Sequence, residues 1–307
     1  MNLKDKLQII LVTYNRSKYA KRTLDLFLNA SPVKDCDLLV LDNNSTDDTG
    51  QVVAEFQKSH GNLSYIKNKY NVGLSGNIAR AMELADKEYV WIIGDDDVYD
   101  FSHWDEAEAA MMRGEKLICI ARYALPEGHE REIPHQLFQL TFITGGIYHT
   151  SLFNDVTMRN TYDNLYTLFP HLFPIVAFIN SGSQVCVLPH PVSDNGLPAE
   201  PKDCSYIRGL KNSPELSLRT RDTLWILGYA NVLALLKDKA LIRACLDAAL
   251  THPDIMPSKT AFYLYLRDLR RHRKNFFHEI YDLLAPSRKM AFWLFLIGRN
   301  LRLVSKK

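Results

Sequence analysis

The stretch YVWIIGDDD, Tyr89 to Asp97, is informative about the fold because an apolar run ends abruptly in three charged residues. A short apolar run bounded by a turn signal predicts a strand that is buried on both faces. Three consecutive carboxylates follow it, and each raises the pKa of its neighbours. The turn therefore needs water or a cation: it is either a solvated acidic turn or a site for a divalent metal ion.

The residues before this stretch alternate between strand and helix patterns. Further buried strands are predicted at Leu7–Tyr14, Cys36–Asp42 and Leu63–Asn68. Mostly apolar residues at helical spacing fall between them, namely Ala20, Thr23, Leu24, Phe27 and Leu28, then Val52, Val53 and Phe56, then Ile78, Ala81, Met82 and Ala85. Buried strands separated by amphipathic helices predict an α/β fold, with a mostly parallel sheet covered by helices on both faces.

Polar residues follow three of these strands at the point where each strand ends. Right-handed crossovers bring the carboxyl ends of parallel strands to one edge, which is where ligands bind in such folds. That edge gathers Thr13–Asn15, Asp42–Ser45 and Gly94–Asp97. Mg²⁺ and Mn²⁺ prefer oxygen ligands, and a metal ion held there would neutralise a diphosphate leaving group. We therefore expect a cleft for a divalent cation and a phosphorylated ligand.

Two features near this edge also have purely structural explanations. Thr46 is expected to cap the next helix, and Asp47 and Asp48 then complement its positive end, which explains both carboxylates without function. The segment NVGLSGN, with Gly73 and Gly76, opens the third helix and suits either a phosphate or an ordinary turn. It matches neither GxGxxG nor the P-loop, which argues against a nicotinamide dehydrogenase and a P-loop kinase.

The composition is that of an ordinary globular protein, with 307 residues, 47% of them hydrophobic and 23% charged. The net charge of +2 is unevenly spread, because Ile255–Lys307 carries +9 and the remainder −7. The five cysteines form no CxxC pair, which favours a reducing cytosol. We recognise no signal peptide, and no apolar run reaches the roughly 18 residues of a membrane span.

The rest of the chain is less regular. Its predicted elements are a strand at Lys116–Leu125, a strand and turn at Phe142–His149, a helical stretch at Asn164–Asn180 and a strand at Gln184–Pro189. A proline-rich linker or long loop at Pro191–Asp203 and helices from about Ser213 onward follow. We therefore expect two regions, a ligand-binding α/β domain over residues 1–200 and a basic helical region over residues 201–307.

Four blocks in this order, ILVTYNR, LLVLDNNSTDDT, NVGLSGN and YVWIIGDDD, resemble those of family-2 glycosyltransferases with the GT-A fold. The resemblance is strong over residues 7–100, looser to residue 190, and absent from the last hundred residues. It implies a nucleotide-sugar donor, inversion at the anomeric carbon, and assistance by Mn²⁺ or Mg²⁺. The GDDD form resembles members that build bacterial O-antigen and capsule sugars, which implies a glycan acceptor on a lipid carrier.

The resemblance also implies roles for individual residues. The nucleotide-binding residues would be Thr13, Tyr14, Asn15, Asp42, Asn77, Arg80 and Asp95, with Asp42 binding the base. Many members read DxDD where this chain reads Gly94 to Asp97, so either Asp96 or Asp97 is expected to bind the metal. The segment Thr144–Gly146 would border the donor sugar, with a plain turn as the alternative.

An inverting transfer needs a base that takes the proton of the acceptor hydroxyl as it attacks. Many relatives offer a Glu-Asp pair beyond the glycine-containing strand, but no such pair occurs between Asn154 and Phe173. Asp163 and His171 are the catalytic candidates, with Asp155 behind them. The alternatives are that Asp163 caps a helix and that His171 only packs at a helix start.

The basic tail combines cations with bulky apolar residues in Arg267–Lys274 and Ser287–Lys307. That pattern suits a helix on an anionic membrane surface, and the alternative is internal packing or a dimer contact. No nucleic-acid partner is expected, because the rest of the chain is acidic and carries no recognised nucleic-acid motif. The expected location is cytoplasmic, peripheral on the inner face of the cytoplasmic membrane where the tail binds it.

Three other functions compete with this interpretation. A sugar-1-phosphate nucleotidyltransferase needs a glycine-rich loop after the first strand, where this chain has TYNRSKY. Processive polysaccharide synthases resemble this family too, but they carry a QxxRW motif and membrane spans, and neither is found in the sequence. A catalytically degenerate chain that binds nucleotide sugar or scaffolds an assembly complex stays open, because the acidic pair is missing.

Overall fold

The computed structural model of the chain describes residues 2–120, 132–190, 192–194, 225, 228–251 and, with short gaps, 263–304. Within them a seven-stranded sheet has the order β3-β2-β1-β4-β7-β6-β8. Its strands are β1 (Leu7–Thr13), β2 (Asp37–Asp42), β3 (Leu63–Lys67), β4 (Tyr89–Gly94), β6 (Leu117–Ile120), β7 (Gly146–His149) and β8 (Cys186–Leu188). The four strands predicted in the first hundred residues are confirmed to within one residue at each end.

The sheet is mostly parallel, as predicted. β1 pairs in parallel with β2 and β4, and β2 with β3, so Thr13 lies opposite Asp42 and Val12 opposite Gly94. The carboxyl ends of these strands therefore share one edge. β7 is the exception, because it runs antiparallel to both β4 and β6. The sequence did not reveal this reversal.

A short second ribbon lies beyond the acidic stretch. β5 (Val98–Tyr99) pairs antiparallel with β9 (Ser193–Asp194), and Asp100 N donates a hydrogen bond to Val192 O at 2.8 Å. The segment from Pro191 was predicted to be a loop, and its residues at β9 are instead extended and paired. The other residues of that segment, like residues 121–131 after β6, lie outside the described part of the chain.

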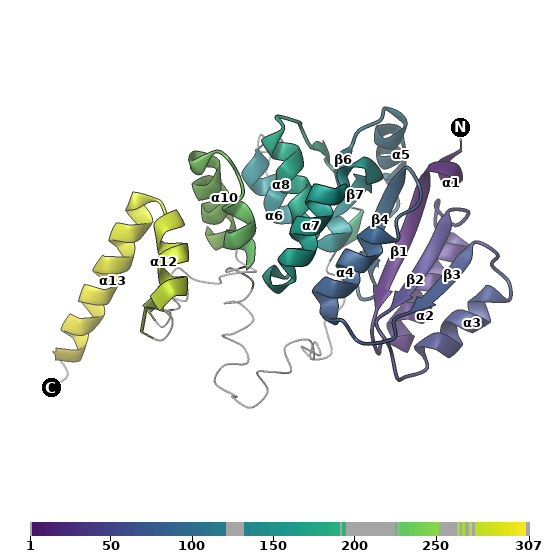
Figure 1. Cartoon of the computed structure of the whole chain (residues 1–307), viewed down its shortest axis with the longest axis horizontal. Coiled ribbons are helices and arrows are strands. Elements are labelled where there is room, and N and C mark those ends of the chain that lie inside the picture. The colour runs from purple at the N-terminus through teal and green to yellow at the C-terminus, as the bar shows by residue number, and fades with distance from the viewer. Residues whose placement is uncertain are drawn as a thin grey trace.

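Helices cover both faces of the sheet (Figure 1). One face carries α1 (Leu3–Lys6), α2 (Ser17–Asp25), the π-helix η1 (Leu26–Ala30), α3 (Thr49–Gln57) and α5 (Trp104–Met112). The other carries α4 (Gly73–Glu83), α6 (Ile133–Gln139), α7 (Asp155–Asp163) and α8 (Leu172–Asn180). Three 3-10 turns, η2 (Ile143–Gly145), η3 (Thr150–Leu152) and η4 (Leu165–Thr167), connect elements in the second half.

The side chains of β1 alternate between two hydrophobic clusters. Ile9 and Leu11 pack into the cluster that contains α2 and α5, whereas Ile10 and Val12 pack into the one that contains α4 and α8. All four are buried. Burial of both faces explains why the strand sequence is a continuous apolar run and does not alternate with polar residues.

The described part of the C-terminal region is helical, as predicted, with α10 (Lys239–Thr251), α12 (Lys274–Leu283) and α13 (Pro286–Val304). Their buried side chains, including Leu246, Ile280 and Phe292, belong to the same cluster as α4 and α8. Figure 1 shows α12 and α13 at the end of the molecule opposite β3. No helix in the described residues is long and apolar enough to cross a bilayer.

Candidate functional site

A cavity of about 350 Å³ opens at the carboxyl edge of the parallel strands, within the size range of small-molecule sites. One wall comes from the ends of β1 and β4 and the start of α4, and the other from the chain around η2, η4 and α8. Eight of the residues named from the sequence line it, namely Thr13, Tyr14, Asn15, Asn77, Asp95, Asp96, Asp97 and His171.

The chain turns sharply at Asn15, directly after β1. Its φ of 52° lies in the left-handed region, which asparagine tolerates better than most residues. Asn15 N donates a hydrogen bond to Ser45 Oγ at 2.8 Å, and Thr46 N donates one to Asn15 Oδ1 at 2.7 Å. These bonds tie the end of β1 to the loop after β2, so one use of the Asn15 side chain is to hold the cavity wall together.

A network of amide side chains joins the end of β2 to the start of α4. Asn43 Nδ2 donates to Asn71 Oδ1 at 2.9 Å, and Asn68 Nδ2 donates to Asn77 Oδ1 at 2.8 Å. Gly73 begins α4 with a φ of +77°, a conformation that glycine adopts without strain. The network fixes the N-terminal turn of α4 against the cavity.

The acidic loop is held by one arginine and one threonine. Arg16 Nη1 lies 3.1 Å from Asp95 Oδ1 and 2.8 Å from Asp96 Oδ2. Thr13 Oγ1 donates a hydrogen bond to Asp95 Oδ2 at 2.5 Å. Asp95 and Asp97 are buried, whereas the side chain of Asp96 is 31% exposed. Asp96 is therefore the carboxylate most open to a ligand.

Contacts from α2 fix the backbone of the same loop. Arg22 Nη2 donates to the carbonyl of Asp97 at 2.6 Å, and Thr23 Oγ1 donates to that of Asp95 at 3.2 Å. A Cβ at Gly94 would lie 3.1 Å from Asp97 Oδ2. Glycine at this position therefore leaves room for the Asp97 carboxylate to fold back over the end of β4.

The electrostatics of the loop favour a further cation. Burial raises the pKa of Asp95 from 3.8 to about 6, although Arg16 and Thr13 act in the opposite direction. Burial alone would lower the pKa of Arg16, but Asp95 and Asp96 outweigh it and raise that pKa. The donor atoms of the loop are all carboxylate oxygens, which fits Mg²⁺ or Mn²⁺ better than a softer ion.

Three of the residues expected to bind nucleotide or to act as the base are not among the lining residues. Asp42 is fully buried, and its two carboxylate oxygens accept hydrogen bonds from Ser45 N at 2.8 Å and Tyr65 Oη at 2.6 Å. Arg80 is exposed on α4, and Asp163 is exposed at the end of α7. The structure therefore does not bring these three side chains to the cavity.

The prediction that Thr46 caps the next helix is wrong. α3 begins at Thr49 with Asp48 as its N-cap residue, and Asp47 Oδ1 accepts a hydrogen bond from Thr49 N at 3.1 Å. Hydrogen bonds from Thr49 and Ser17 outweigh burial and lower the pKa of Asp47. Asp47 thus has a structural role at the start of α3, and the N-cap residue lies two residues later than predicted.

His171 lies in the far wall of the cavity and is only 1% exposed. Its Nε2 lies 2.9 Å from Leu140 O, so Nε2 carries the ring proton and Nδ1 is the acceptor. Nδ1 is buried, and no hydrogen-bond partner for it lies in the described part of the chain. Burial lowers the pKa of His171 to about 4, so the ring is neutral at physiological pH.

Several cavity residues were not singled out from the sequence. Arg16 is the one that the sequence could most easily have indicated, because it directly follows Asn15 in the block ILVTYNR. Phe169 and Trp225 pack edge to face with ring centroids 5.2 Å apart. Trp225 comes from the region beyond residue 200, where no sequence signal pointed to the cavity.

Comparison with known proteins identifies the family. Residues 8–180 match the family described as "Glycosyl transferase family 2". Because this match covers more than half of the 307 residues, the chain belongs to glycosyl transferase family 2.

Two curated relatives align with about a third of the chain. A GalNAc(5)-diNAcBac-PP-undecaprenol beta-1,3-glucosyltransferase of Campylobacter jejuni is 34% identical over 93 residues, which are 30% of this chain and 30% of that protein. The abequosyltransferase RfbV of Salmonella typhimurium is 29% identical over 93 residues, which are 30% of this chain and 28% of that protein. Each alignment thus spans less than a third of the relative's length.

Two solved structures share the fold. The mannosyltransferase PcManGT from Pyrobaculum calidifontis, in complex with GDP-Man and Mn²⁺, has a TM-score of 0.56 at 14% identity, covering 97% of this chain and 80% of its own. TarS of S. aureus has a TM-score of 0.52 at 16% identity, covering 89% of this chain and 54% of its own. The fold is therefore GT-A, as predicted.

Proposed function

We propose that the chain transfers a sugar, with inversion, from a nucleotide-diphosphate sugar to a glycan acceptor, assisted by Mn²⁺ or Mg²⁺. The observation that carries this proposal is a single cavity, in a family-2 chain, that is lined by Thr13–Arg16, Asn77 and Asp95–Asp97. A phosphorylated ligand and a cation would share that cavity. The predicted nucleotide-binding roles of Asp42 and Arg80 belong to this proposal, and each requires the residue to reach the cavity by rearrangement.

Asp96 and Asp97 are the residues that would hold the metal ion, with the exposed Asp96 as the first contact. When bound, the metal supplies positive charge that stabilises the departing diphosphate. Arg16 holds Asp95 and Asp96 in place, and it offsets part of their mutual repulsion before the donor binds. Its guanidinium is also available to a phosphate oxygen in the same space, because Arg16 lines the cavity.

In the proposed reaction the acceptor hydroxyl oxygen bonds to the anomeric carbon as the bond from that carbon to the diphosphate breaks. The hydroxyl proton passes to a base, and the nucleoside diphosphate leaves. His171 is the candidate that lines the cavity, and its pKa of about 4 gives it the basicity of a carboxylate. Its buried Nδ1 must turn toward the acceptor for this role. Asp163, the second candidate, would have to move from the surface.

The acceptor is proposed to be a glycan on a lipid diphosphate carrier of the kind used for bacterial surface polysaccharides. One relative is named for a PP-undecaprenol-linked glycan. The C-terminal helices would bring the cavity to such an acceptor. This proposal places the protein in the cytoplasm, at the inner face of the cytoplasmic membrane.

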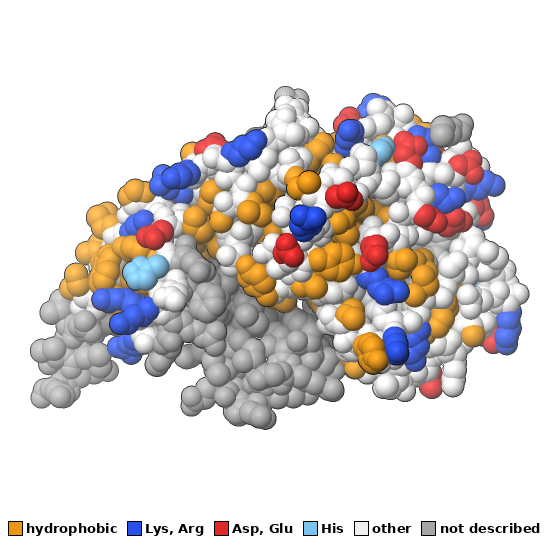
Figure 2. Space-filling view, viewed as in Figure 1, with side chains coloured by type: hydrophobic (Ala, Val, Ile, Leu, Met, Phe, Trp, Pro, Cys, Tyr) orange, Lys and Arg blue, Asp and Glu red, His pale blue; other side chains and the backbone are white. Residues whose placement is uncertain are grey.

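An exposed apolar stripe on α13 supports the membrane contact. Met290, Trp293, Leu294 and Ile297 are 63%, 40%, 60% and 54% exposed, and their spacing of three, four and seven residues places them on one helix face. The guanidinium of Arg270 lies 4.6 Å from the centroid of the Trp293 ring. Figure 2 shows hydrophobic and basic side chains together at this end of the molecule. Apolar residues beside cations suit an interface with anionic lipid.

Isothermal titration against a panel of nucleoside diphosphates, with and without Mn²⁺, tests the donor site. We expect Mn²⁺-dependent binding that Asp96→Ala weakens by at least about tenfold, because it removes a direct ligand of the metal. The matched variant Asp97→Ala decides which of the two aspartates is that ligand. The absence of nucleotide binding by the folded chain would refute the proposal.

Transfer from a labelled donor separates an enzyme from a degenerate scaffold. A scaffold would bind nucleotide and transfer nothing, whereas the proposed enzyme releases nucleoside diphosphate in step with glycan product. Within that assay, His171→Ala and Asp163→Asn test the base. Full transfer rates in both variants would contradict the base assignment and leave the family membership intact.

A further inference from the structure

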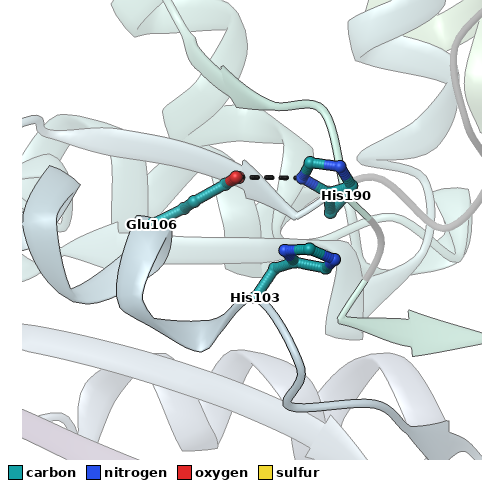
Figure 3. Close-up of side chains that lie close together, drawn as sticks. All are labelled: His103, Glu106 and His190. Carbon is teal, nitrogen blue, oxygen red and sulfur yellow. Dashed lines mark hydrogen bonds and ion pairs between the residues drawn. The ribbon is translucent and has the colours of Figure 1, made fainter.

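A second group of metal-ligand side chains gathers at the start of α5 (Figure 3). His103 is the N-cap residue of α5, Glu106 lies in its first turn, and His190 follows β8. One ligand atom of each lies within 4.8 Å of those of the other two. None of the three residues lines the cavity. This group is therefore separate from the acidic loop.

The three side chains are already arranged around a common space. His190 Nδ1 lies 2.9 Å from Glu106 Oε1. The rings of His103 and His190 stack, with centroids 3.8 Å apart and planes 15° apart. Figure 3 shows the Glu106 carboxylate beside the two stacked rings, pointing toward them. Two imidazoles and one carboxylate thus converge from two distant parts of the sequence.

The second carboxylate oxygen of Glu106 is the evidence that the group binds a further ligand. Glu106 Oε2 is buried and has no hydrogen-bond partner among the residues that the structure describes. A carboxylate oxygen shielded from water is costly unless a donor or a cation compensates it. In the part of the chain that the structure describes, the ion pair recorded for Glu106 is with His190 alone. A cation in this space would satisfy the carboxylate.

We propose that His103, Glu106 and His190 bind one divalent ion of the zinc class, such as Zn²⁺, Co²⁺ or Ni²⁺. Imidazole nitrogen favours these ions, whereas the all-oxygen loop at Asp95–Asp97 favours Mg²⁺ or Mn²⁺. Ligand atoms about 2.1 Å from a tetrahedral ion lie about 3.4 Å apart, so the group must contract. Because the two rings stack face to face, one of them must also rotate before both nitrogens point at the same ion. The side chain of His190 is 45% exposed and is free to turn. When Nδ1 of a neutral His190 ring binds the ion, the proton that Nδ1 shares with Glu106 moves to Nε2.

The ion would clamp the ribbon that adjoins the acidic loop. His103 lies four residues after β5, and His190 three residues before β9. Tyr99 of β5 donates its hydroxyl hydrogen to the carbonyl of Gly94 at 2.7 Å, directly before the three aspartates. A bond network through one ion would hold the two strands of the ribbon together. The inference does not depend on the proposed transfer reaction.

The test is a Zn²⁺ titration of the full chain after treatment with a chelator. A large excess of Mg²⁺ keeps the acidic loop from contributing. We expect one tight Zn²⁺ site, a rise in the thermal midpoint on binding, and visible absorption typical of four-coordinate Co²⁺ after substitution. His190→Ala and Glu106→Gln should each weaken Zn²⁺ binding by about 100-fold or more, since even outer partners of a metal ligand contribute 10–100-fold.

His135→Ala is the matched control, because His135 pairs with Glu132 at 3.5 Å in another histidine–glutamate ion pair. It should keep the affinity of the unsubstituted chain. Unchanged Zn²⁺ binding in His190→Ala, or no binding by the unsubstituted chain, would overturn the proposal. Metal-free melting of each variant shows whether it is folded, and the Glu106→Gln variant keeps the test valid if one histidine variant is not.

Discussion

Replacing Asp95 with asparagine should make the metal-free chain more stable at neutral pH. Asparagine is an uncharged isostere of protonated Asp95. Its Oδ1 can accept from Arg16 Nη1, as Asp95 Oδ1 does at 3.1 Å, and its Nδ2 can donate to Thr13 Oγ1. The substitution therefore removes the cost of a buried charge and keeps both contacts. It also removes a carboxylate from the donor cavity, so stability and function should change in opposite directions.

The magnitude follows from the pKa of Asp95, which burial raises from 3.8 to about 6. A raised pKa means that the folded state holds the proton more tightly than the unfolded state. Stability contributed by that proton is therefore complete below pH 3.8 and lost as the pH rises through about 6. The shift corresponds to about 3 kcal/mol at pH 8, and about half of that at pH 5.

Thermal unfolding in the presence of a chelator measures this difference. At about pH 8 the Asp95→Asn variant should melt about 6 °C above the unsubstituted chain, at roughly 2 °C per kcal/mol for a chain of this size. The gap should fall to about half at pH 5. Thr13→Val is the matched control, because it removes the hydrogen-bond donor and leaves the charge. An equal or lower melting temperature for Asp95→Asn at pH 8 would refute the reasoning.

Three further perturbations test other parts of the structure. Gly228→Ala should lower the free energy of unfolding, measured in urea, by about 3 kcal/mol, because its Cβ would lie 1.7 Å from the carbonyl oxygen of Thr167. Gly61→Ala is the control, because its Cβ would meet no atom of the described residues within 4 Å. At saturating donor, kcat should stay level as pH falls and drop only near pH 4, because the lowered pKa keeps His171 neutral above that value; a drop near pH 6.5 would contradict this. Trp293→Glu should weaken co-sedimentation with anionic vesicles by at least about tenfold, since burying one large apolar side chain stabilises the bound state by about 2 kcal/mol. Met112→Glu, at an exposed apolar residue on α5, should not.

The parts of the fold that follow from local patterns were predicted from the sequence. β1 and β4 are continuous apolar runs, since helices cover both faces of the sheet, and their polar ends fall on one edge because they are parallel. That argument placed Thr13 and Asp95 in one cavity. The argument did not use the opposite wall of the cavity, which the chain around η2, η4 and α8 forms.

The features that were missed depend on pairing between distant segments. β7 is only four residues long, and its antiparallel direction is set by where the chain returns after α6. The pairing of Val98 with Asp194 joins residues almost a hundred positions apart. Asp163 sits in a suitable stretch of sequence, but α7 ends there with the side chain exposed. Neither periodicity nor motif spacing specifies these outcomes.

A strained backbone conformation also occurs in the wall of the cavity. Leu168 lines the cavity with a φ of 67°, a left-handed conformation that is unfavourable for a branched side chain. Gly228 packs against the carbonyl group of Thr167, the residue before Leu168, so closely that no Cβ fits between them. Trp225, three residues before Gly228, also lines the cavity. Trp225 thus brings the region beyond residue 200 to the cavity, so the boundary proposed at residue 200 does not separate the cavity from that region.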